Sequence, residues 1–311
     1  MGKYTVTTGQ NIYDVALHLY GSIEGVVDLL IHNEDLSFGT RLQAGDILSY
    51  TDDYVISSDT VAYYKLHNIT PANGERNVYL KTSSYPVLME MQVDPKNTQA
   101  ELRIAGSGML DLDWGDNSPI ERIVLVDKPT TYSHCFDNLI SGKRKIWVYS
   151  ETPQIKQLDV TSVYCLSLCL FRPLYIETFT LTSGRINLDF ISLFTGTYEI
   201  NLQKTKTVSL LPLLYCKELM KLDLSGSIFE QDAIDSYLIA LVKNYQGRRN
   251  AQVILSGMPS GNYEEPTRDE HGNYIIQSGM QAIWVITHEP TWNEAGEWRF
   301  SIGDTTYTGL I

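Results

Sequence analysis

The first fifty residues show two hydrophobic periods, one typical of strands and one typical of helices. Tyr4 and Val6 alternate with polar neighbours as in a half-buried strand, and Gln10-Asn11 then offers a helix cap. The glycine of Tyr20-Gly21 suits the left-handed end of a first helix, and a second helical stripe follows. The apolar positions of the two helices are Ile12, Val15, Ala16 and Leu19, then Ile23, Val26, Val27, Leu30 and Ile31. A closing strand over 42–50 completes a predicted βααβ module at residues 1–50.

Three stretches of this module resemble the LysM domain: YTVTTGQNIYDVA, DLLIHN and RLQAGDILSY. LysM domains bind N-acetylglucosamine polymers in a groove between the loop after the first strand and the loop before the second. The resemblance therefore implies a site on loops 8–12 and 33–36. The candidate binding residues, for a partner or a glycan, are Thr8, Gly9, Gln10, Asn11, Ile12, Asn33, Glu34, Asp35, Leu36 and Phe38.

Two details of the module favour an adaptor over a sugar binder. Tyr20-Gly21 and the stretch LLIHN resemble the LysM-like tail protein X of contractile phages, which works as a baseplate or tail-hub adaptor. Sugar-binding relatives often carry Asp-Thr-Leu after the first glycine, where this chain has Gln10-Asn11-Ile12. An adaptor is expected to use Ile12, Leu36 and Phe38 as apolar contacts inside a polar rim. Glycan binding remains the alternative.

A connector is predicted over residues 51–84, followed by a β-rich domain over 85–150. SSDTVAYYKLHN is compatible with one short helix, and ITPANGERN has the composition of turns. Farther on, LDLDWGDNSP and TTYSHCF resemble the signature of a PKD-type β-sandwich. Asp111, Asp113 and Asp116 in this domain suggest calcium, which prefers oxygen ligands. The EF-hand glycine and terminal glutamate are missing, so a solvated acidic face is the preferred interpretation, and no metal site is predicted.

A repeat is visible between residues 151 and 257. Triplets whose first and third residues are apolar begin at Leu158, Phe179, Ile200 and Leu222, at steps of 21, 21 and 22 residues. This period with Leu-x-Leu triplets resembles a leucine-rich-repeat solenoid, although its asparagine ladder is absent. The predicted inward positions of neighbouring parallel strands are Val160, Leu181, Leu202, Leu224 and Leu255. The helical stretch EQDAIDSYLIALVKNYQ lies within the last repeat.

The segment 258–311 is predicted to be a small β region. Its expected strands are MQAIWVITHE, EWRFSIG and TTYTGLI, after a turn-rich stretch. Trp284, Trp292 and Trp298 suggest a sugar-stacking platform, but aromatic residues at this spacing more often fill a small core.

Composition excludes several classes of function. The net charge of −13 argues against a nucleic-acid partner, which would need a basic surface. No signal peptide and no apolar run long enough to cross a bilayer are visible. The Cys165/Cys169 spacing lacks a second pair, so zinc is not predicted, and all four cysteines are expected to be buried thiols. None of the common hydrolase, zinc-protease, phosphate-loop or dinucleotide motifs occurs, so no catalytic residue, no cofactor and no enzyme activity are predicted.

The predicted fold class is a multidomain α+β chain. It consists of a βααβ LysM-like module, a PKD-like β-sandwich, a short leucine-rich-repeat solenoid and a small C-terminal β segment. Such a string of modules is typical of a structural component of a phage tail, baseplate or related contractile injection apparatus. Its partners would be other tail or baseplate subunits in a homo- or hetero-oligomeric assembly, made in the host cytoplasm and placed in the virion tail. The alternative is a cell-surface adhesin that binds peptidoglycan, and a peptidoglycan hydrolase is a third, disfavoured option.

Overall fold

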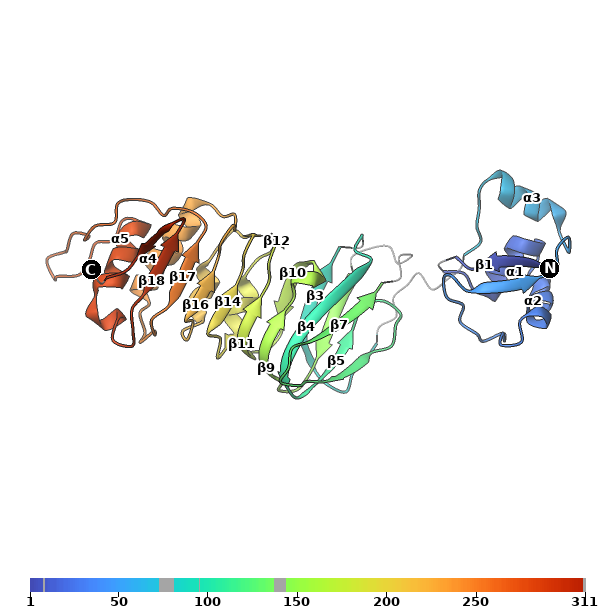
Figure 1. The fold of residues 1–311 in the computed structure, drawn as a ribbon, viewed down its shortest axis with the longest axis horizontal. Helices are drawn as coiled ribbons and strands as arrows, with labels where there is room; N and C mark the ends of the chain where they lie inside the picture. Colours follow the sequence, from blue (N-terminus) through green and yellow to red (C-terminus); the bar gives the residue numbers. More distant parts are fainter. Residues whose placement is uncertain (8, 73–80, 95, 137–143, 310–311) are drawn as a thin grey trace. The chain divides into compact units, whose positions relative to one another are not determined.

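The computed structural model describes residues 1–7, 9–72, 81–94, 96–136 and 144–309 (Figure 1). The chain divides into two compact units, which among these residues are unit 1 (1–72) and unit 2 (81–309). Each unit has its own hydrophobic core.

Unit 1 combines a two-stranded antiparallel sheet with three α-helices. Its elements are β1 (Gly2–Thr5), α1 (Ile12–Tyr20), the 3₁₀ helix η1 (Ile23–Gly25), α2 (Val26–His32), β2 (Ile47–Tyr50) and α3 (Ser58–Leu66). β1 pairs with β2 along its whole length, with Gly2 opposite Tyr50 and Thr5 opposite Ile47. The core of the unit consists of Val6, Ile12, Val15, Ala16, Tyr20, Val26, Leu29 and Leu48.

The segment after β2 is part of unit 1, although the sequence predicts a connector over 51–84. The backbone amides of Ile56 and Ser57 both donate to the carbonyl of Tyr20, at 2.9 Å each. Val61 is the buried residue of α3, which packs against α1. These contacts satisfy the carboxyl end of α1, so a stretch of connector-like composition is folded onto the module.

An antiparallel sheet of five strands begins unit 2, in the order β10-β3-β8-β5-β6. Its strands are β3 (Val87–Val93), β5 (Met109–Asp113), β6 (Glu121–Val124), β8 (Arg144–Tyr149) and β10 (Cys165–Leu170). The Trp-Gly-Asp turn follows β5. Gly115 has a φ of 78°, and a Cβ there would lie 2.2 Å from the carbonyl oxygen of Lys145. Only glycine fits this turn without displacing β8.

The second sheet of unit 2 has ten strands and follows the path β19-β18-β17-β16-β14-β11-β9-β4-β7, with β13 also paired to β11. Its strands are β4 (Gln99–Ser107), β7 (Thr130–Cys135), β9 (Gln154–Asp159), β11 (Leu174–Thr180), β13 (Phe194–Thr195), β14 (Glu199–Asn201), β16 (Lys221–Asp223), β17 (Gln252–Leu255), β18 (Arg299–Ile302) and β19 (Thr305–Tyr307). β9 pairs antiparallel with β4 and parallel with β11, so the two kinds of pairing meet at this strand.

The parallel strands stack in one register. Leu158, Phe179, Ile200, Leu222, Val253 and Phe300 lie opposite one another in successive strands, and all are buried. Two residues farther along, Val160, Leu181, Leu202, Leu224, Leu255 and Ile302 form a second buried column. The prediction that five of these residues occupy equivalent inward positions is confirmed. Equal steps in sequence become equal steps in space because these strands pair in order along the stack, each with the next.

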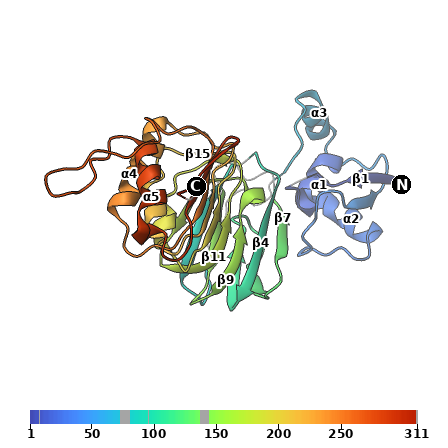
Figure 2. The same cartoon turned by 60° about the vertical axis from the view of Figure 1, so that its left-hand side comes forward.

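Helices cover the apolar side of the parallel strands. The 3₁₀ helices are η2 (Thr161–Val163), η3 (Asp189–Leu193), η4 (Leu211–Tyr215) and η5 (Pro290–Trp292), and the α-helices are α4 (Gln231–Lys243) and α5 (Gly279–His288). β12 (Gly184–Arg185) and β15 (Thr205–Lys206) form a separate parallel pair. Figure 2 shows α4 and α5 together on one side of the sheet. Buried residues of both helices belong to the same core as the strands.

The predicted fold class is wrong. The protein is mainly β, with 31% of its residues in strands and 23% in helices, and unit 2 is built on large multi-strand sheets. A single core runs from Leu88 to Ile302, so the predicted sandwich, repeat solenoid and C-terminal segment are not separate modules. The physical reason is the pairing of β9 with both β4 and β11. Hydrophobic periodicity locates strands but does not reveal which strands share an edge.

One predicted strand is a helix. All of MQAIWVITHE except its last residue, Glu289, lies within α5, and Ser278 caps that helix by accepting from the amide of Gln281 at 3.3 Å. The β-branched residues favoured a strand, but packing against α4 decides the outcome. Trp292 and Trp298 are buried and pack edge to face, and Trp284 stacks on His288. Two of the three tryptophans are therefore core residues, and the three form no exposed sugar platform.

Candidate docking surface

The first predicted binding loop mainly holds unit 1 together. Thr8 lies outside the described residues, and Gly9 adopts a left-handed φ of 83°. The buried Gln10 accepts hydrogen bonds from the Tyr4 hydroxyl at 3.0 Å and the Thr7 amide at 2.9 Å. Its Nε2 donates to the carbonyl of Pro71 at 2.9 Å. The side chain of Gln10 thus ties the amino-terminal turn to the end of the unit.

Asn11 and Ile12 are likewise structural. Asn11 Oδ1 accepts from the amides of Tyr13 at 2.9 Å and Asp14 at 3.0 Å, while Asp14 Oδ2 accepts from the Asn11 amide at 2.9 Å. This reciprocal capping box satisfies the first turn of α1. Ile12 is buried in the core of unit 1, so the prediction that it is an apolar contact for a partner is wrong.

Replacing Asn11 tests the capping role. Asn11→Ala is expected to cost about 1 kcal/mol of local stability, since it leaves two amides of α1 without their acceptor. Amide exchange in α1, followed by mass spectrometry, should accelerate about fivefold. Asn11→Ser, which retains a capping oxygen, should exchange nearly as slowly as the original protein. Equal exchange in the alanine variant would contradict the capping role.

The second predicted loop divides into structural and exposed residues. Asn33 Nδ2 donates to the carbonyls of Leu29 at 2.8 Å and Ser49 at 2.9 Å, and its Oδ1 accepts from the Ser49 amide at 2.9 Å. These bonds join the end of α2 to β2, so Asn33 is also a structural residue. Leu36 packs against the core of the unit. Glu34, Asp35 and Phe38, the other candidate residues of this loop, are exposed.

A different surface of unit 1 has the properties of a docking site. Ile23, Val27 and Ile31 follow one another at intervals of four residues, and 53%, 58% and 68% of their respective surfaces are exposed. Residues at this spacing lie along one face of a helix. We call these three residues the α2 stripe. Contiguous exposed apolar surface marks interaction sites.

The sequence contains the α2 stripe but does not distinguish it from the core face. Periodicity placed Val26, Val27 and Ile31 on one buried face, whereas the structure buries Val26 and Leu29 and exposes the α2 stripe. The sequence signal for the α2 stripe is the presence of two apolar stripes on one short helical segment. A helix that packs against the core on one side needs only one apolar stripe.

The position of α2 is held by Asp28. Its carboxylate accepts from the Tyr20 hydroxyl at 2.7 Å and from the amide and hydroxyl of Thr51 at 2.9 and 2.6 Å. Burial alone would raise the pKa of Asp28, but the bonds from Thr51 and Tyr20 outweigh it and lower that pKa. Burial and the bond to Asp28 raise the pKa of Tyr20. The charged form of Asp28 thus anchors the buried side of α2.

The charge around the α2 stripe is negative. Glu24 lies within η1 beside Ile23, and Glu34 and Asp35 are exposed directly after α2. Residues 1–72 contain nine acidic and three basic residues, a net charge of −6. A partner for this surface should therefore place basic side chains around an apolar centre.

Unit 2 buries the acidic residues that the sequence analysis considered for calcium. Asp111 pairs with Arg122, with 2.8 Å between Oδ1 and Nε, and accepts from the Ser83 hydroxyl at 2.7 Å. The hydrogen bond from Arg122 is the main cause that lowers the pKa of Asp111. Asp113 pairs with Lys81 at 2.5 Å. Both carboxylates thus have a cationic partner and are buried, so the prediction of a solvated acidic face is wrong.

Asp116 is held in the same way. Its Oδ2 lies 2.6 Å from His134 Nε2, and its Oδ1 accepts from the Ser118 amide at 2.9 Å. Burial raises the pKa of Asp116, but the bonds from His134 and Ser118 are stronger in sum and lower it. His134 also stacks on Trp114, with ring centroids 5.1 Å apart. Across the described residues, no group of three or more His, Cys, Asp or Glu side chains could hold a metal ion.

The four cysteines differ in exposure. Cys165 and Cys216 are buried as expected, whereas Cys135 and Cys169 are exposed, and all four are free thiols.

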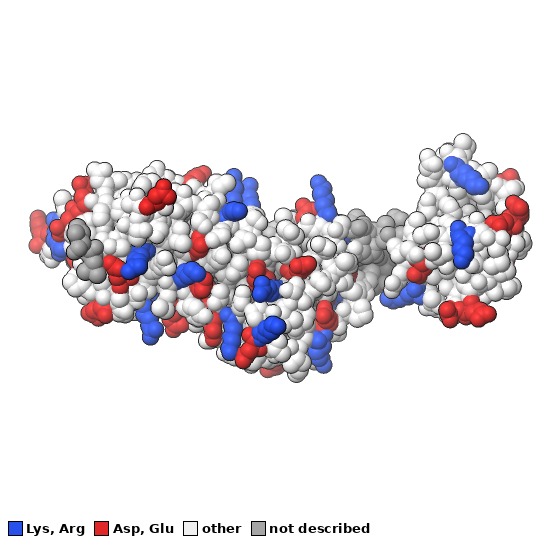
Figure 3. Space-filling model, viewed as in Figure 1, with Lys and Arg blue, Asp and Glu red and all other residues white. Residues whose placement is uncertain are grey.

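On the face of unit 2 shown in Figure 3, acidic and basic side chains are mixed and form no patch of one sign.

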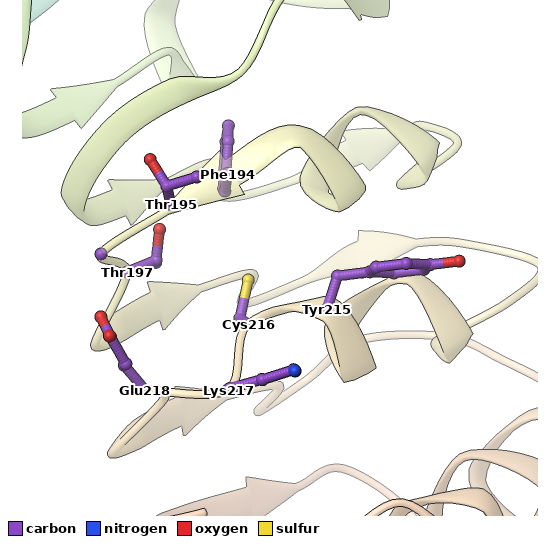
Figure 4. Close-up of a pocket in the computed structure, with 8 residues that line it drawn as sticks. Phe194, Thr195, Thr197, Tyr215, Cys216, Lys217 and Glu218 are labelled. Carbon is purple, nitrogen blue, oxygen red and sulfur yellow. The ribbon is translucent and has the colours of Figure 1, made fainter. Parts of the chain in front are cut away.

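A pocket of about 210 Å³ lies between two successive turns of the parallel stack (Figure 4). Phe194–Thr197 line one side and Tyr215–Glu218 the other. Burial raises the pKa of the Cys216 thiol to about 12, so it is protonated at neutral pH. The Thr197 hydroxyl donates to the Ile176 carbonyl at 2.7 Å. Neither side chain is an activated nucleophile.

No family model matches the chain, and neither the curated proteins nor the solved structures include a match. Within the described ranges, no single helix is long and apolar enough to cross a bilayer. The helical segments Ile12–Tyr20 and Ile23–His32 reach that length only together, with a bend of 110° between them.

Proposed function

We propose that the protein is a non-enzymatic structural component of a multi-subunit assembly, of the phage-tail or contractile-injection type, and that it docks through the α2 stripe. The observation that carries this proposal is the exposed row of Ile23, Val27 and Ile31 beside the unit 1 core. Between 53% and 68% of the surface of each residue is left to bury, so each contributes roughly half to two thirds of the about 1.5–3 kcal/mol of a fully buried aliphatic side chain. That range is sufficient for the centre of an interface.

The occupant we propose is a protein subunit with an apolar patch ringed by Lys or Arg. A glycan would need polar groups to bind its hydroxyls, and the α2 stripe presents only hydrocarbon. An anionic membrane would be repelled by Glu24, Glu34 and Asp35. A second copy of unit 1 would bring the same acidic residues together. A protein surface with an apolar patch and surrounding Lys or Arg residues complements both the α2 stripe and the acidic residues beside it.

The Tyr20-Gly21 pair supports this arrangement. Gly21 has a φ of 71°, and a Cβ there would lie 2.3 Å from the carbonyl of Ser57. Glycine therefore allows the sharp bend after α1, and Ser22 then begins η1 by accepting from the amide of Glu24. The pair that carries the resemblance to the tail adaptor thus sets the direction of the α2 stripe.

The test is assembly of the full chain with the products of the genes that flank its own. We expect at least one flanking product to form a complex that is stable in size-exclusion chromatography with light scattering. Ile31→Glu should weaken it about thirtyfold or more, because a charge at the centre of an interface removes its main apolar contact. Leu66→Glu is the matched control, since Leu66 is 79% exposed on α3 in the same unit. A complex that tolerates Ile31→Glu, or the absence of any complex, would overturn the proposal.

The glycan-binding adhesin remains a second candidate because Phe38 is an exposed aromatic ring beside Glu34 and Asp35. Aromatic faces stack on sugar rings. Titration of chitin oligomers into the full chain, followed by NMR, tests it separately. Saturable shifts confined to residues 33–38 and abolished by Phe38→Ala would favour the adhesin. An unchanged spectrum would exclude it.

A further inference from the structure

A second, larger pocket of about 670 Å³ lies on the helical side of the parallel stack in unit 2. η4 supplies Leu211, Pro212 and Tyr215, and the chain leaving α4 supplies Asn244 and Arg248. This volume is in the range of pockets that hold small organic ligands. It opens beside the pocket of Figure 4, with which it shares Tyr215 and Lys217, and Figure 4 shows these two side chains extending to the same side.

Two cations line this pocket without a carboxylate partner. Arg248 is buried and donates to the carbonyls of Leu214, Cys216 and Asn244. Lys217 is exposed at the pocket. Among the described residues, no Asp or Glu lies within ion-pair distance of either cation, in a chain whose net charge is −13. Burial lowers the pKa of Arg248, because desolvation disfavours its charged form.

The other polar groups of the pocket can form hydrogen bonds with the hydroxyl groups of a ligand. Ser209, Gln246 and Asn244 contribute one hydroxyl and two amides, and Asp189 contributes a carboxylate. Gln246 has a left-handed φ of 46°, a conformation that is unusual for glutamine. Tyr215 adds an exposed aromatic ring. Amides, a hydroxyl and an aromatic ring around two cations match a polyhydroxylated ring that carries a negative group.

We infer that this pocket binds a sugar ring bearing an anionic substituent, a carboxylate or a phosphate. Lys217 and Arg248 hold the anionic group, and Tyr215 packs against the ring. The side chains of Ser209, Asn244 and Gln246 hydrogen-bond to the ring hydroxyls. This site is in unit 2 and does not depend on docking through unit 1. It gives unit 2 a ligand-binding role, whereas the proposed docking involves only unit 1.

The test uses the full chain and three defined probes: glucuronic acid, glucose 6-phosphate and glucose. Chemical shifts of the backbone amides of residues 209–217 and 244–248 report binding. Monosaccharide affinities in the millimolar range are expected for the two acidic sugars, and at least about tenfold weaker binding for glucose. The tighter of the two acidic probes identifies the source of the negative charge.

Two variants and a control decide the assignment. Lys217→Met should weaken binding of the acidic sugars about tenfold, because it removes a charge-assisted hydrogen bond. Tyr215→Ser should weaken it as well, while Lys206→Met, at an exposed lysine outside the pocket, should not. Glucose binding as tightly as the acids, acetate or phosphate alone binding as tightly as the acidic sugars, or no saturable shift in these residues would overturn the inference.

Discussion

Leu202→Ala is expected to lower the free energy of unfolding of unit 2 by about 3 kcal/mol, within the 2–5 kcal/mol typical of a buried leucine. Leu202 is fully buried in the second column, between Leu181 and Leu224 of the adjacent strands. The cavity cannot be filled by sliding one strand, because β14, which Leu202 follows, is hydrogen-bonded to β11 on one side and to β16 on the other. Tryptophan fluorescence during denaturant unfolding measures the effect.

All five tryptophans lie in unit 2, at positions 114, 147, 284, 292 and 298, so the fluorescence signal reports on this unit alone. Val208→Ala is the matched control, since Val208 is 83% exposed six residues along the chain. It should change stability by no more than about 0.5 kcal/mol. Amide exchange in α1 of unit 1 should be unaffected by either variant, because the cores are separate. Equal losses for the two variants would contradict the inward column.

Arg248→Met should destabilise unit 2 by about 3 kcal/mol. The guanidinium group donates from Nε to the carbonyl of Asn244 at 3.1 Å and from Nη1 to that of Cys216 at 3.0 Å, and Nη2 donates to Leu214. These carbonyls belong to the ends of α4 and η4, where the helix dipoles are negative. Removal leaves the acceptors without partners, at about 1–3 kcal/mol each, offset in part because a buried charge is also removed.

Arg248→Lys should recover only part of the loss, because an ammonium group cannot span three carbonyls as the planar guanidinium does. Arg249→Met is the control at the neighbouring exposed position. Thermal unfolding followed by tryptophan fluorescence compares the four proteins. Full stability of Arg248→Lys would show that charge alone, and not the geometry of the guanidinium, stabilises the end of α4.

The sequence predicts the strand register better than it predicts the architecture. Leu181 and Leu202 could be placed in adjacent parallel strands because their spacing repeats and each ends a triplet that also begins with an apolar residue. The fusion of the sandwich with the parallel stack could not be predicted, since the pairing of β9 with β4 depends on contacts far apart in the sequence. The helix α5 was missed because its β-branched residues favour strands when packing is ignored.

The candidate site shows the same division between local and tertiary information. Gln10, Asn11 and Asn33 are polar residues in loops, as binding residues usually are, but their side chains are used by the backbone around them. Local hydrogen bonds of Asn to backbone groups leave no periodic signal in a sequence. Periodicity places the α2 stripe on one face with Val26 and Leu30, because it identifies apolar positions without showing which of them another element covers.

The common register of β9, β11, β14 and β16 makes the stack adjustable in length. Apart from the short β13, which also pairs with β11, the strands of the stack pair only with their two neighbours. A duplicated segment of 21 residues, such as residues 158–178, would therefore present the same edges as the original. One such insertion would move α4 and α5 away from β4 by one strand spacing, about 4.8 Å. Relatives of different span could thus arise by gaining or losing single turns, with both ends of unit 2 unchanged.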